Sequence, residues 1–509
     1  MSQPTGLPYS RAMMMTTTTT HLHYIDGQWQ PAQSGATTPN RNPADPTDLI
    51  GLAAAGDSAD VAMAVAAATS AYPAWRNTPA PRRGEILFRA AQLLQARQDT
   101  LAEEMTREMG KVAHEARIDI QKAIDMLRLM AGEGRRLHGQ TTPSELPDKH
   151  CMTVRTPLGV VACITPFNFP VAAPVWKIAP ALVCGNTVVF KPAEDTPLMA
   201  QRLVEILAEA GLPNGVLNLV HGSGLAAGEP LASHPDVALV AFTGSCQTGR
   251  RINTLCAPTF KRVSLQLGGK NASIVLGDLT DADLDRAADC IIKAAFAQTG
   301  QICTATSRVV VDKRVHAALR DKLLARIAAV QPGRTMGPLV SKTAMQRVLQ
   351  AIEQGQQEGA TLLYGGRRET VAGTGKEPGW FVQPTLFDHV TPAMRLAQDE
   401  LFGPVVGLMV ADGFQDAMAM ANGTAQGLSV AVHTRCINTV FAALEALEAG
   451  MVYVNLPSFG AEVPLPFGGT KASGNGQREG GTACLDTFSA WKTCYVDFSD
   501  RLQRAQLEA

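Results

Sequence analysis

The sequence has little excess charge and no long apolar run. Its 45 basic and 46 acidic side chains leave a formal net charge of −1, so it lacks the cationic character of a nucleic-acid-binding protein. No apolar stretch reaches the roughly 18 residues that a membrane span needs. We therefore expect neither nucleic acid nor a membrane as a partner.

The cysteines are equally informative for what they lack. The ten cysteines form no CxxC pair and show no spacing with histidine that is typical of a metal site. We therefore expect no metal ligands and no disulfide framework. Because a secretory apolar segment is also missing, the sequence predicts a cytoplasmic protein with free thiols. Residues 1–20 offer little to bury and are expected to form a disordered extension.

The chain does have length and a regular alternation of elements. With 509 residues, of which 46% are hydrophobic and 18% charged, it predicts two or three globular domains. Residues 159–244 alternate apolar strands with helices, and a second α/β run begins at Ala272. The first pattern predicts a parallel, doubly wound sheet that binds a nucleotide at the carboxyl ends of its strands. Arg250 and Arg251 follow the glycines at 244–249 and argue against a P-loop NTPase.

The segment from Ala295 to Arg308 carries one cysteine, Cys303, among small and polar residues. A cysteine thiolate can attack a carbonyl carbon and form a covalent intermediate. For an arbitrary cysteine, however, packing in the core is the commoner role. The motifs around Cys303 therefore have to decide between the two interpretations.

Seven short motifs occur in a fixed order along the chain. TPFNFP, KPAEDTP, FTGS and LGGK precede the GQIC segment of Cys303, and DELFGPV and PFGG follow it. In this order they resemble the aldehyde dehydrogenase superfamily over residues 21–499. The resemblance implies an α/β aldehyde dehydrogenase fold with a Rossmann-like cofactor domain, an α/β catalytic domain and a small β oligomerisation flap. The implied boundaries are 21–138 and 158–268 for the NAD-binding domain, 269–470 for the catalytic domain, and 139–157 and 486–499 for the flap.

The same resemblance implies three catalytic positions. Cys303 would be the nucleophile, and Asn168 would donate its amide N–H to the oxyanion together with the Cys303 backbone N–H. The family carries its general base, a glutamate, where this chain has Gln266. Since an amide cannot accept a proton at neutral pH, hydride transfer should survive while hydrolysis of the thioester is in doubt. Glu479 is the nearest carboxylate within a motif that could replace the base.

Cofactor contacts are expected at the strand ends. Lys191 and Glu194 follow the strand at 187–191, where a lysine would donate to a ribose or phosphate. A carboxylate at Glu194 would accept from the adenosine ribose and repel a 2′-phosphate, which favours NAD over NADP. The alternative is a surface Lys–Glu pair. The resemblance adds further cofactor contacts at Thr165, Phe167, Gly244, Ser245, Gly268, Glu400 and Phe402.

The predicted reaction is NAD-dependent oxidation of an aldehyde to its acid through a cysteine thioester. The segment GAEVPLPFGG (460–469) resembles the semialdehyde dehydrogenases of sugar-acid breakdown, so a carboxylated substrate such as 2-oxoglutarate semialdehyde is expected. Ala172 and Ala173 suggest a roomy entrance, whereas Lys122 is best interpreted as a solvated helical lysine. Three alternatives stay open: a CoA-acylating dehydrogenase, a cysteine hydrolase without a redox cofactor, and an inactive binding homologue. We expect a homodimer or homotetramer.

Overall fold

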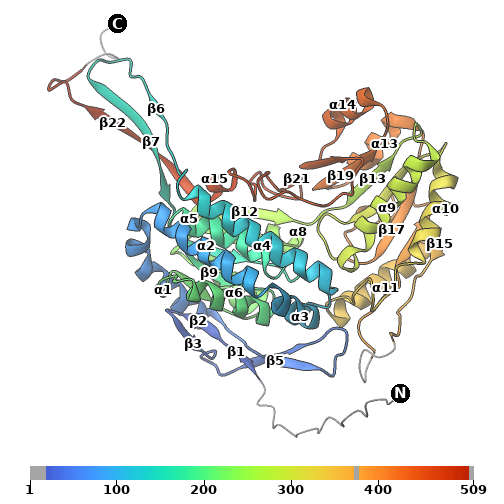
Figure 1. Ribbon diagram of the computed structural model, residues 1–509, viewed down its shortest axis with the longest axis horizontal. Coiled ribbons are helices and arrows are strands. Elements are labelled where there is room, and N and C mark those ends of the chain that lie inside the picture. The colour runs from blue at the N-terminus through green and yellow to red at the C-terminus, as the bar shows by residue number, and fades with distance from the viewer. Residues whose placement is uncertain (1–18, 372–377, 504–509) are drawn as a thin grey trace, which may run out of the picture.

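The computed structural model describes residues 19–371 and 378–503. Two seven-stranded sheets lie side by side, and a three-stranded sheet projects from one end of the molecule (Figure 1). Residues 1–18 of the extension expected at 1–20 lie outside the described residues. Thr20, which was assigned to that extension, already belongs to strand β1 (Thr20–His21), which pairs in parallel with β5.

The first large sheet has the strand order β12-β11-β8-β9-β10-β2-β3. Its strands are β12 (Arg262–Leu267), β11 (Val237–Gly244), β8 (Val160–Ile164), β9 (Thr187–Lys191), β10 (Leu217–Leu219), β2 (His23–Ile25) and β3 (Gln28–Gln30). The five strands from β12 to β10 are parallel, as predicted, and β2–β3 is an antiparallel hairpin at the edge. The strand order reverses between β8 and β11, which makes their carboxyl ends the switch point of a doubly wound sheet.

Helices cover both faces of this sheet because its central strands are apolar on both sides. Val161 and Cys163 of β8 pack into one core, and Val160 and Ala162 pack into the other. The helices of this half are α1 (Ser58–Asn77), α2 (Ala80–Ala96), α3 (Gln98–Met109), α4 (Ala113–Glu133), α5 (Ala172–Val183), α6 (Pro197–Glu209), α7 (Glu229–Ser233) and α8 (Cys246–Cys256).

The second large sheet has the order β15-β16-β17-β14-β13-β19-β20, and only the edge strand β15 is antiparallel to its neighbour. Its strands are β15 (Thr361–Tyr364), β16 (Thr385–Asp388), β17 (Val405–Ala411), β14 (Thr306–Asp312), β13 (Asn271–Val275), β19 (Ser429–His433) and β20 (Met451–Val454). Its helices are α9 (Asp281–Phe296), α10 (His316–Ile327), α11 (Lys342–Gln357), α12 (Arg395–Gln398), α13 (Gly413–Asn422) and α14 (Ile437–Ala446).

The projecting sheet joins segments far apart in the sequence (Figure 1). Its strands are β22 (Ser489–Asp497), β7 (Lys149–Pro157) and β6 (Thr141–Thr142), in that order, and α15 (Cys484–Phe488) leads into β22. Two smaller sheets combine β1 with β4 (Thr37–Arg41) and β5 (Leu49–Ala54), and β18 (Gln426–Gly427) with β21 (Thr470–Lys471). We call the projecting sheet the flap.

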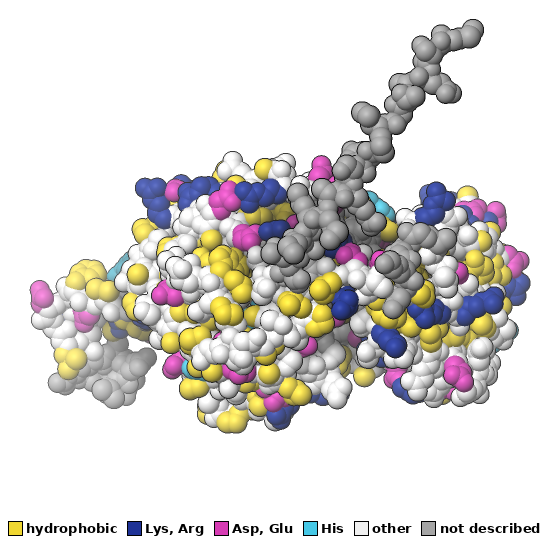
Figure 2. All heavy atoms as spheres, turned by 90° about the horizontal axis from the view of Figure 1, so that it is seen from below, with side chains coloured by type: hydrophobic (Ala, Val, Ile, Leu, Met, Phe, Trp, Pro, Cys, Tyr) yellow, Lys and Arg dark blue, Asp and Glu magenta, His cyan; other side chains and the backbone are white. Residues whose placement is uncertain are grey.

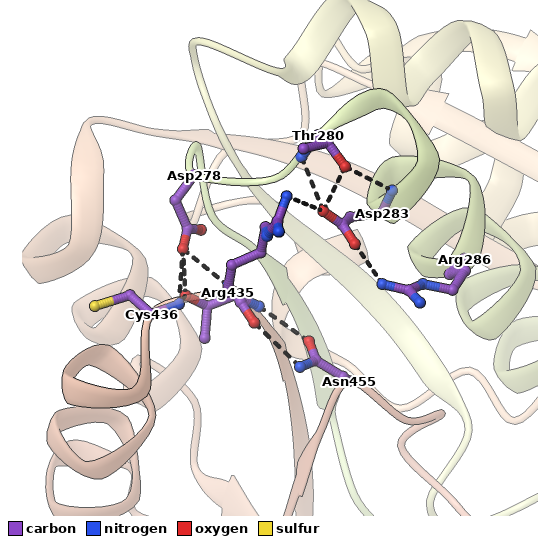
Figure 3. Close-up of polar contacts among 8 residues, drawn as sticks. Asp278, Thr280, Asp283, Arg286, Arg435, Cys436 and Asn455 are labelled. Atoms are coloured by element: carbon purple, nitrogen blue, oxygen red, sulfur yellow. Dashed lines mark hydrogen bonds and ion pairs between the residues drawn. The ribbon is translucent and has the colours of Figure 1, made fainter.

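A polar cluster fixes the start of α14 at the edge of the second sheet (Figure 3). The Asp278 carboxylate accepts hydrogen bonds from the Thr434 hydroxyl at 2.7 Å and from the backbone N–H groups of Arg435 and Cys436. The Asn455 amide, just beyond β20, donates to the Thr434 carbonyl at 3.1 Å. These contacts therefore hold the start of α14 against the edge strand β20.

The distribution of charged side chains on the surface agrees with the formal net charge of −1. Basic and acidic side chains lie next to one another across the face in Figure 2. In the described residues, no helix combines the length and hydropathy required to cross a membrane. All ten cysteines are unpaired, which confirms the prediction of free thiols.

Candidate active site

A cavity of about 930 Å³ opens at the switch point of the first sheet and extends to the second. The loop after β8, the end of β11 and the end of β12 form one wall, and the Cys303 loop faces them. The predicted site residues that line the cavity are Phe167, Asn168, Gly244, Ser245, Gln266, Gly268, Cys303, Glu400 and Phe402. Nine of the twelve residues chosen from the sequence thus meet around one cavity.

The Cys303 loop is held in a strained conformation. Gln298, Thr299 and Gly300 all adopt positive φ values, of 47°, 61° and 70°. For the two residues that carry a Cβ, this conformation costs roughly 1–2 kcal/mol each. The Glu115 carboxylate accepts from the Gln298 N–H at 2.7 Å, and the Thr299 hydroxyl donates to the Gly337 carbonyl at 2.9 Å. These contacts hold the loop that presents Cys303 to the cavity.

Burial raises the pKa of the Cys303 thiol to about 12. The negative charges of Glu400 and Glu479 also act to raise this pKa, whereas the backbone N–H groups of Cys303 and Thr304 oppose the effect. In the protein alone, the sulfur is therefore a thiol at neutral pH. Formation of the nucleophile requires either a base or an added positive charge nearby.

Asn168 is fixed by contacts on both its side chain and its backbone. Its amide donates to the Gln301 carbonyl at 2.9 Å, directly beside the Cys303 loop. Its own carbonyl accepts from the Lys111 ammonium at 2.8 Å, and Lys111 forms a fully buried ion pair with Asp119. Asn168 is therefore not a surface turn residue that caps its own backbone, and its amide is oriented toward the cysteine segment.

Gln266 lies at the end of β12 and is 2% exposed. Its side-chain nitrogen has no hydrogen-bond partner among the described residues. The segment after β21 fixes this strand end: Ser473 accepts from the Leu267 N–H at 3.0 Å, and its hydroxyl donates to the Gly268 carbonyl at 2.7 Å. The amide is thus held on the cavity wall with free donor capacity.

Glu479 reaches the same cavity from the carboxyl-terminal part of the chain. Its carboxylate forms a buried ion pair with Lys177 of α5, and the Thr243 hydroxyl at the end of β11 lies 3.4 Å away. Lys177 was missed from the sequence. The available signal was a single charge within the otherwise apolar helix PVWKIAPALV.

The part of the cavity where the nicotinamide ring is expected to bind is tightly packed. A Cβ on Gly268 would lie only 1.8 Å from a Glu400 carboxylate oxygen, so a side chain at this position would displace the Glu400 carboxylate. Burial raises the pKa of Glu400 to about 7, and its carboxylate accepts from the Gly269 N–H at 3.2 Å. Phe402 and Phe167 pack edge to face with ring centroids 5.8 Å apart. Together they form a narrow apolar and acidic cleft beside Cys303.

Three predicted cofactor residues lie outside the main cavity. Lys191 is buried at the end of β9 and donates to the Pro192 carbonyl at 2.6 Å, so the alternative of a surface Lys–Glu pair is wrong. The Thr165 N–H donates to the Lys191 carbonyl, and its buried hydroxyl has no partner within the described chain. Glu194 accepts from the Gly224 N–H at 3.0 Å and borders a second cavity of about 130 Å³.

Comparison with known proteins agrees with this geometry. The model of the aldehyde dehydrogenase family matches residues 29–494. An alpha-ketoglutaric semialdehyde dehydrogenase of Bacillus subtilis (strain 168) is 42% identical over 95% of this chain and 99% of its own length. A phenylacetaldehyde dehydrogenase of Pseudomonas fluorescens is 41% identical over 94% of this chain and 96% of its own length.

A crystal structure of betaine aldehyde dehydrogenase from Staphylococcus aureus, in complex with NAD+, superposes with a TM-score of 0.91. The two sequences are 31% identical, and the match covers 95% of this chain and 96% of the other. The fold predicted from the ordered motifs is confirmed. The chain belongs to the aldehyde dehydrogenase family and is an NAD(P)-dependent oxidoreductase of that family.

Proposed function

We propose that this protein oxidises a carboxylated semialdehyde, such as 2-oxoglutarate semialdehyde, to the acid with NAD as hydride acceptor. The observation that carries the proposal is the single cavity at the switch point on which Cys303, Asn168 and Gln266 meet. The Bacillus subtilis relative, named for this semialdehyde, supports the substrate class. The Pseudomonas fluorescens relative makes a neutral aldehyde the second candidate.

The covalent step begins at Cys303. Its deprotonated sulfur attacks the carbonyl carbon and forms a tetrahedral adduct with a negatively charged oxygen. The Asn168 amide already donates one hydrogen to Gln301, and its second hydrogen can stabilise this oxygen together with the Cys303 backbone N–H. Loss of hydride from the adduct, which bound NAD would accept, leaves an acyl thioester on Cys303. Glu400 and Glu479 are the carboxylates whose charges act on the thiol and can take its proton.

Release of the acyl group needs a nucleophilic water, and here Gln266 matters most. An amide can orient a water molecule but cannot remove its proton. General-base assistance is worth roughly 10²–10⁴-fold, so its loss slows hydrolysis of the thioester. Glu479 supplies the remaining base, and deacylation limits turnover. The amide at position 266 in place of a base also favours a second candidate, transfer of the acyl group to the thiol of coenzyme A, since a thiol needs less activation than water.

The residues along the strand ends fit a dinucleotide. Gly268 gives the close backbone approach that a bound ring system needs, and Ser245 caps the N-terminus of α8 by accepting from the Thr248 N–H. The Lys191 ammonium and the Glu194 carboxylate lie farther along the same edge, where they would bind the adenosine ribose. Because Glu194 would repel a 2′-phosphate, NAD is preferred over NADP.

The flap is proposed to bind a second copy of the chain. Four large apolar side chains of β22 and its end are exposed: Trp491, Tyr495, Val496 and Phe498. Across the molecule, α14 exposes Ile437, Phe441 and Leu444 along one face, next to the edge strand β20. Exposed apolar patches of this kind mark interaction surfaces, and pairing of the flap with β20 of a partner would cover both.

One assay separates the proposed function from its alternatives. NADH absorbance is followed with 2-oxoglutarate semialdehyde and phenylacetaldehyde, with NAD or NADP, and with or without coenzyme A. We expect NADH formation that depends on Cys303, is fastest with the carboxylated substrate and falls by far more than tenfold in Cys303→Ala. If no NADH forms, two further measurements separate the remaining alternatives. Hydrolysis of an added ester would support the cysteine hydrolase. Binding of NAD without any turnover would support the inactive homologue.

A further inference from the structure

Helix α4 presents one row of side chains to the cavity. His114, Ile118 and Lys122 recur every four residues, so they lie on the same face of the helix, and all three line the cavity. Lys122 is half-buried in this row, whereas Ile118 and His114 are exposed. The row therefore brings one cationic group into the wall of the space that Cys303 also borders.

Apolar residues share the cavity wall with Lys122. Helix α5 contributes Ala172, Ala173 and Trp176 to the same cavity, and a loop after β20 contributes Phe459 and Ala461. The two alanines leave room next to α4, as expected for a wide entrance. An ammonium group in such surroundings is poorly solvated unless another polar group meets it.

The contacts of Lys122 leave its charge uncompensated. Its ammonium donates to the Ala461 carbonyl at 2.7 Å, and it forms no ion pair with any residue in the described ranges. An ammonium carries three N–H donors, so two remain. By contrast, the two fully buried lysines nearby, Lys111 and Lys177, are paired with Asp119 and Glu479.

The position of Lys122 is fixed before any substrate binds. Asp119, one helical turn earlier, accepts from the Ala172 N–H at 2.8 Å and from Lys111 at 2.9 Å. This carboxylate connects α4 to the first turn of α5, so both helices that border the entrance are held together. A charge held in this way loses little entropy when it binds a ligand.

We propose that Lys122 binds the carboxylate of the substrate at the end remote from the aldehyde and thereby determines specificity for carboxylated semialdehydes. The inference rests on the proposed function and names the residue that recognises its substrate class. It also revises the expectation that Lys122 is only a solvated helical lysine. With the carboxylate held at Lys122, the aldehyde end of the substrate is directed toward Cys303 across the same cavity.

The test compares two substrates of equal chain length, 5-oxopentanoate and the neutral pentanal, as a ratio of kcat/KM values. We expect the wild type to prefer the carboxylate, and Lys122→Met to lower the ratio by roughly 10- to 100-fold, the size expected for loss of a charged hydrogen bond. Lys122→Arg should restore most of it. Arg117→Gln removes a charge from an exposed, ion-paired position of the same helix and is the matched control. Inhibition by glutarate provides a second readout and should weaken in parallel.

The possible outcomes separate the proposed substrate class from the proposed role of Lys122. A wild type without preference for the carboxylate would overturn the substrate class, and the role of Lys122 with it. A preference that survives in Lys122→Met would overturn the role of Lys122 alone. Lys293→Met removes the exposed cation on the α9 side of the cavity. If this variant, rather than Lys122→Met, lowers the ratio of kcat/KM values, the role of Lys122 is likewise overturned. Equal losses with both substrates in Lys122→Met would indicate a structural role and would also overturn the proposal.

Discussion

Lys177 and Glu479, which are 302 residues apart in the sequence, form a buried ion pair, and Glu479 lines the cavity that Cys303 also borders. The pair joins α5, which belongs to the cofactor half, to the segment that precedes α15. It brings a carboxylate to a site where the residue expected to be the base, Gln266, carries an amide.

Replacement of Glu479 by glutamine should lower steady-state turnover by roughly 10²-fold or more, because it removes the carboxylate proposed to assist deacylation. The first turnover should change much less. Rapid-mixing measurements of NADH formation separate the two phases, and Glu103→Gln on the exposed face of α3 is a suitable control. A variant with unchanged steady-state turnover would show that Glu479 is not the base.

Alkylation of Cys303 by iodoacetamide should be slow at neutral pH in the absence of cofactor. The raised pKa, about 12, favours the thiol, so the thiolate fraction should grow about tenfold with each pH unit from 7 to 10. Mass spectrometry of the peptide that contains Cys303 measures the rate, with the exposed Cys436 as internal reference. A rate that is already constant between pH 6 and 8 would contradict the raised pKa.

Cofactor preference should depend on Glu194. In Glu194→Gln the negative charge that opposes a 2′-phosphate is lost, so the ratio of kcat/KM with NADP to that with NAD should rise. A wild type that already prefers NADP would contradict the proposed ribose contact.

Removal of residues 487–509 should lower the oligomeric state, because it deletes β22, the flap strand proposed to meet a partner. The substitution Phe441→Glu on α14 should act in the same direction without shortening the chain, since a charge would be buried in the interface. Light scattering measures the mass of both. An unchanged mass in both variants would exclude this surface as the interface.

The sequence predicted the parallel sheet and the cavity residues because their motifs directly follow apolar strands. Residues 165–168 follow β8, and Gly244 ends β11, so the switch point of the sheet brings these segments together. The ion pair of Lys177 with Glu479 could not be predicted, because nothing local in the sequence indicates which buried charges meet. The role proposed for Lys122 rests on a cavity shared with the alanines of α5, and this arrangement could not be predicted for the same reason.

The strained conformation of the Cys303 loop also could not be predicted from the sequence. The glycine at 300 suggests a turn, but nothing in AQTGQIC predicts that Gln298 and Thr299 share its left-handed conformation. Their φ values depend on anchors at Glu115 and Gly337, which lie on distant segments. Motifs thus predict which residues are at the site, whereas tertiary contacts determine how these residues are held.

Gln266 is proposed to allow the thioester to form but to slow its hydrolysis. The most direct measurement is a pre-steady-state time course of NADH formation, with wild type and Gln266→Glu, in the absence of coenzyme A. We predict a burst of about one NADH per active subunit in the wild type, followed by slow turnover, and a faster linear phase without a burst in Gln266→Glu. Fast linear NADH production by the wild type, unchanged in Gln266→Glu, would contradict the claim.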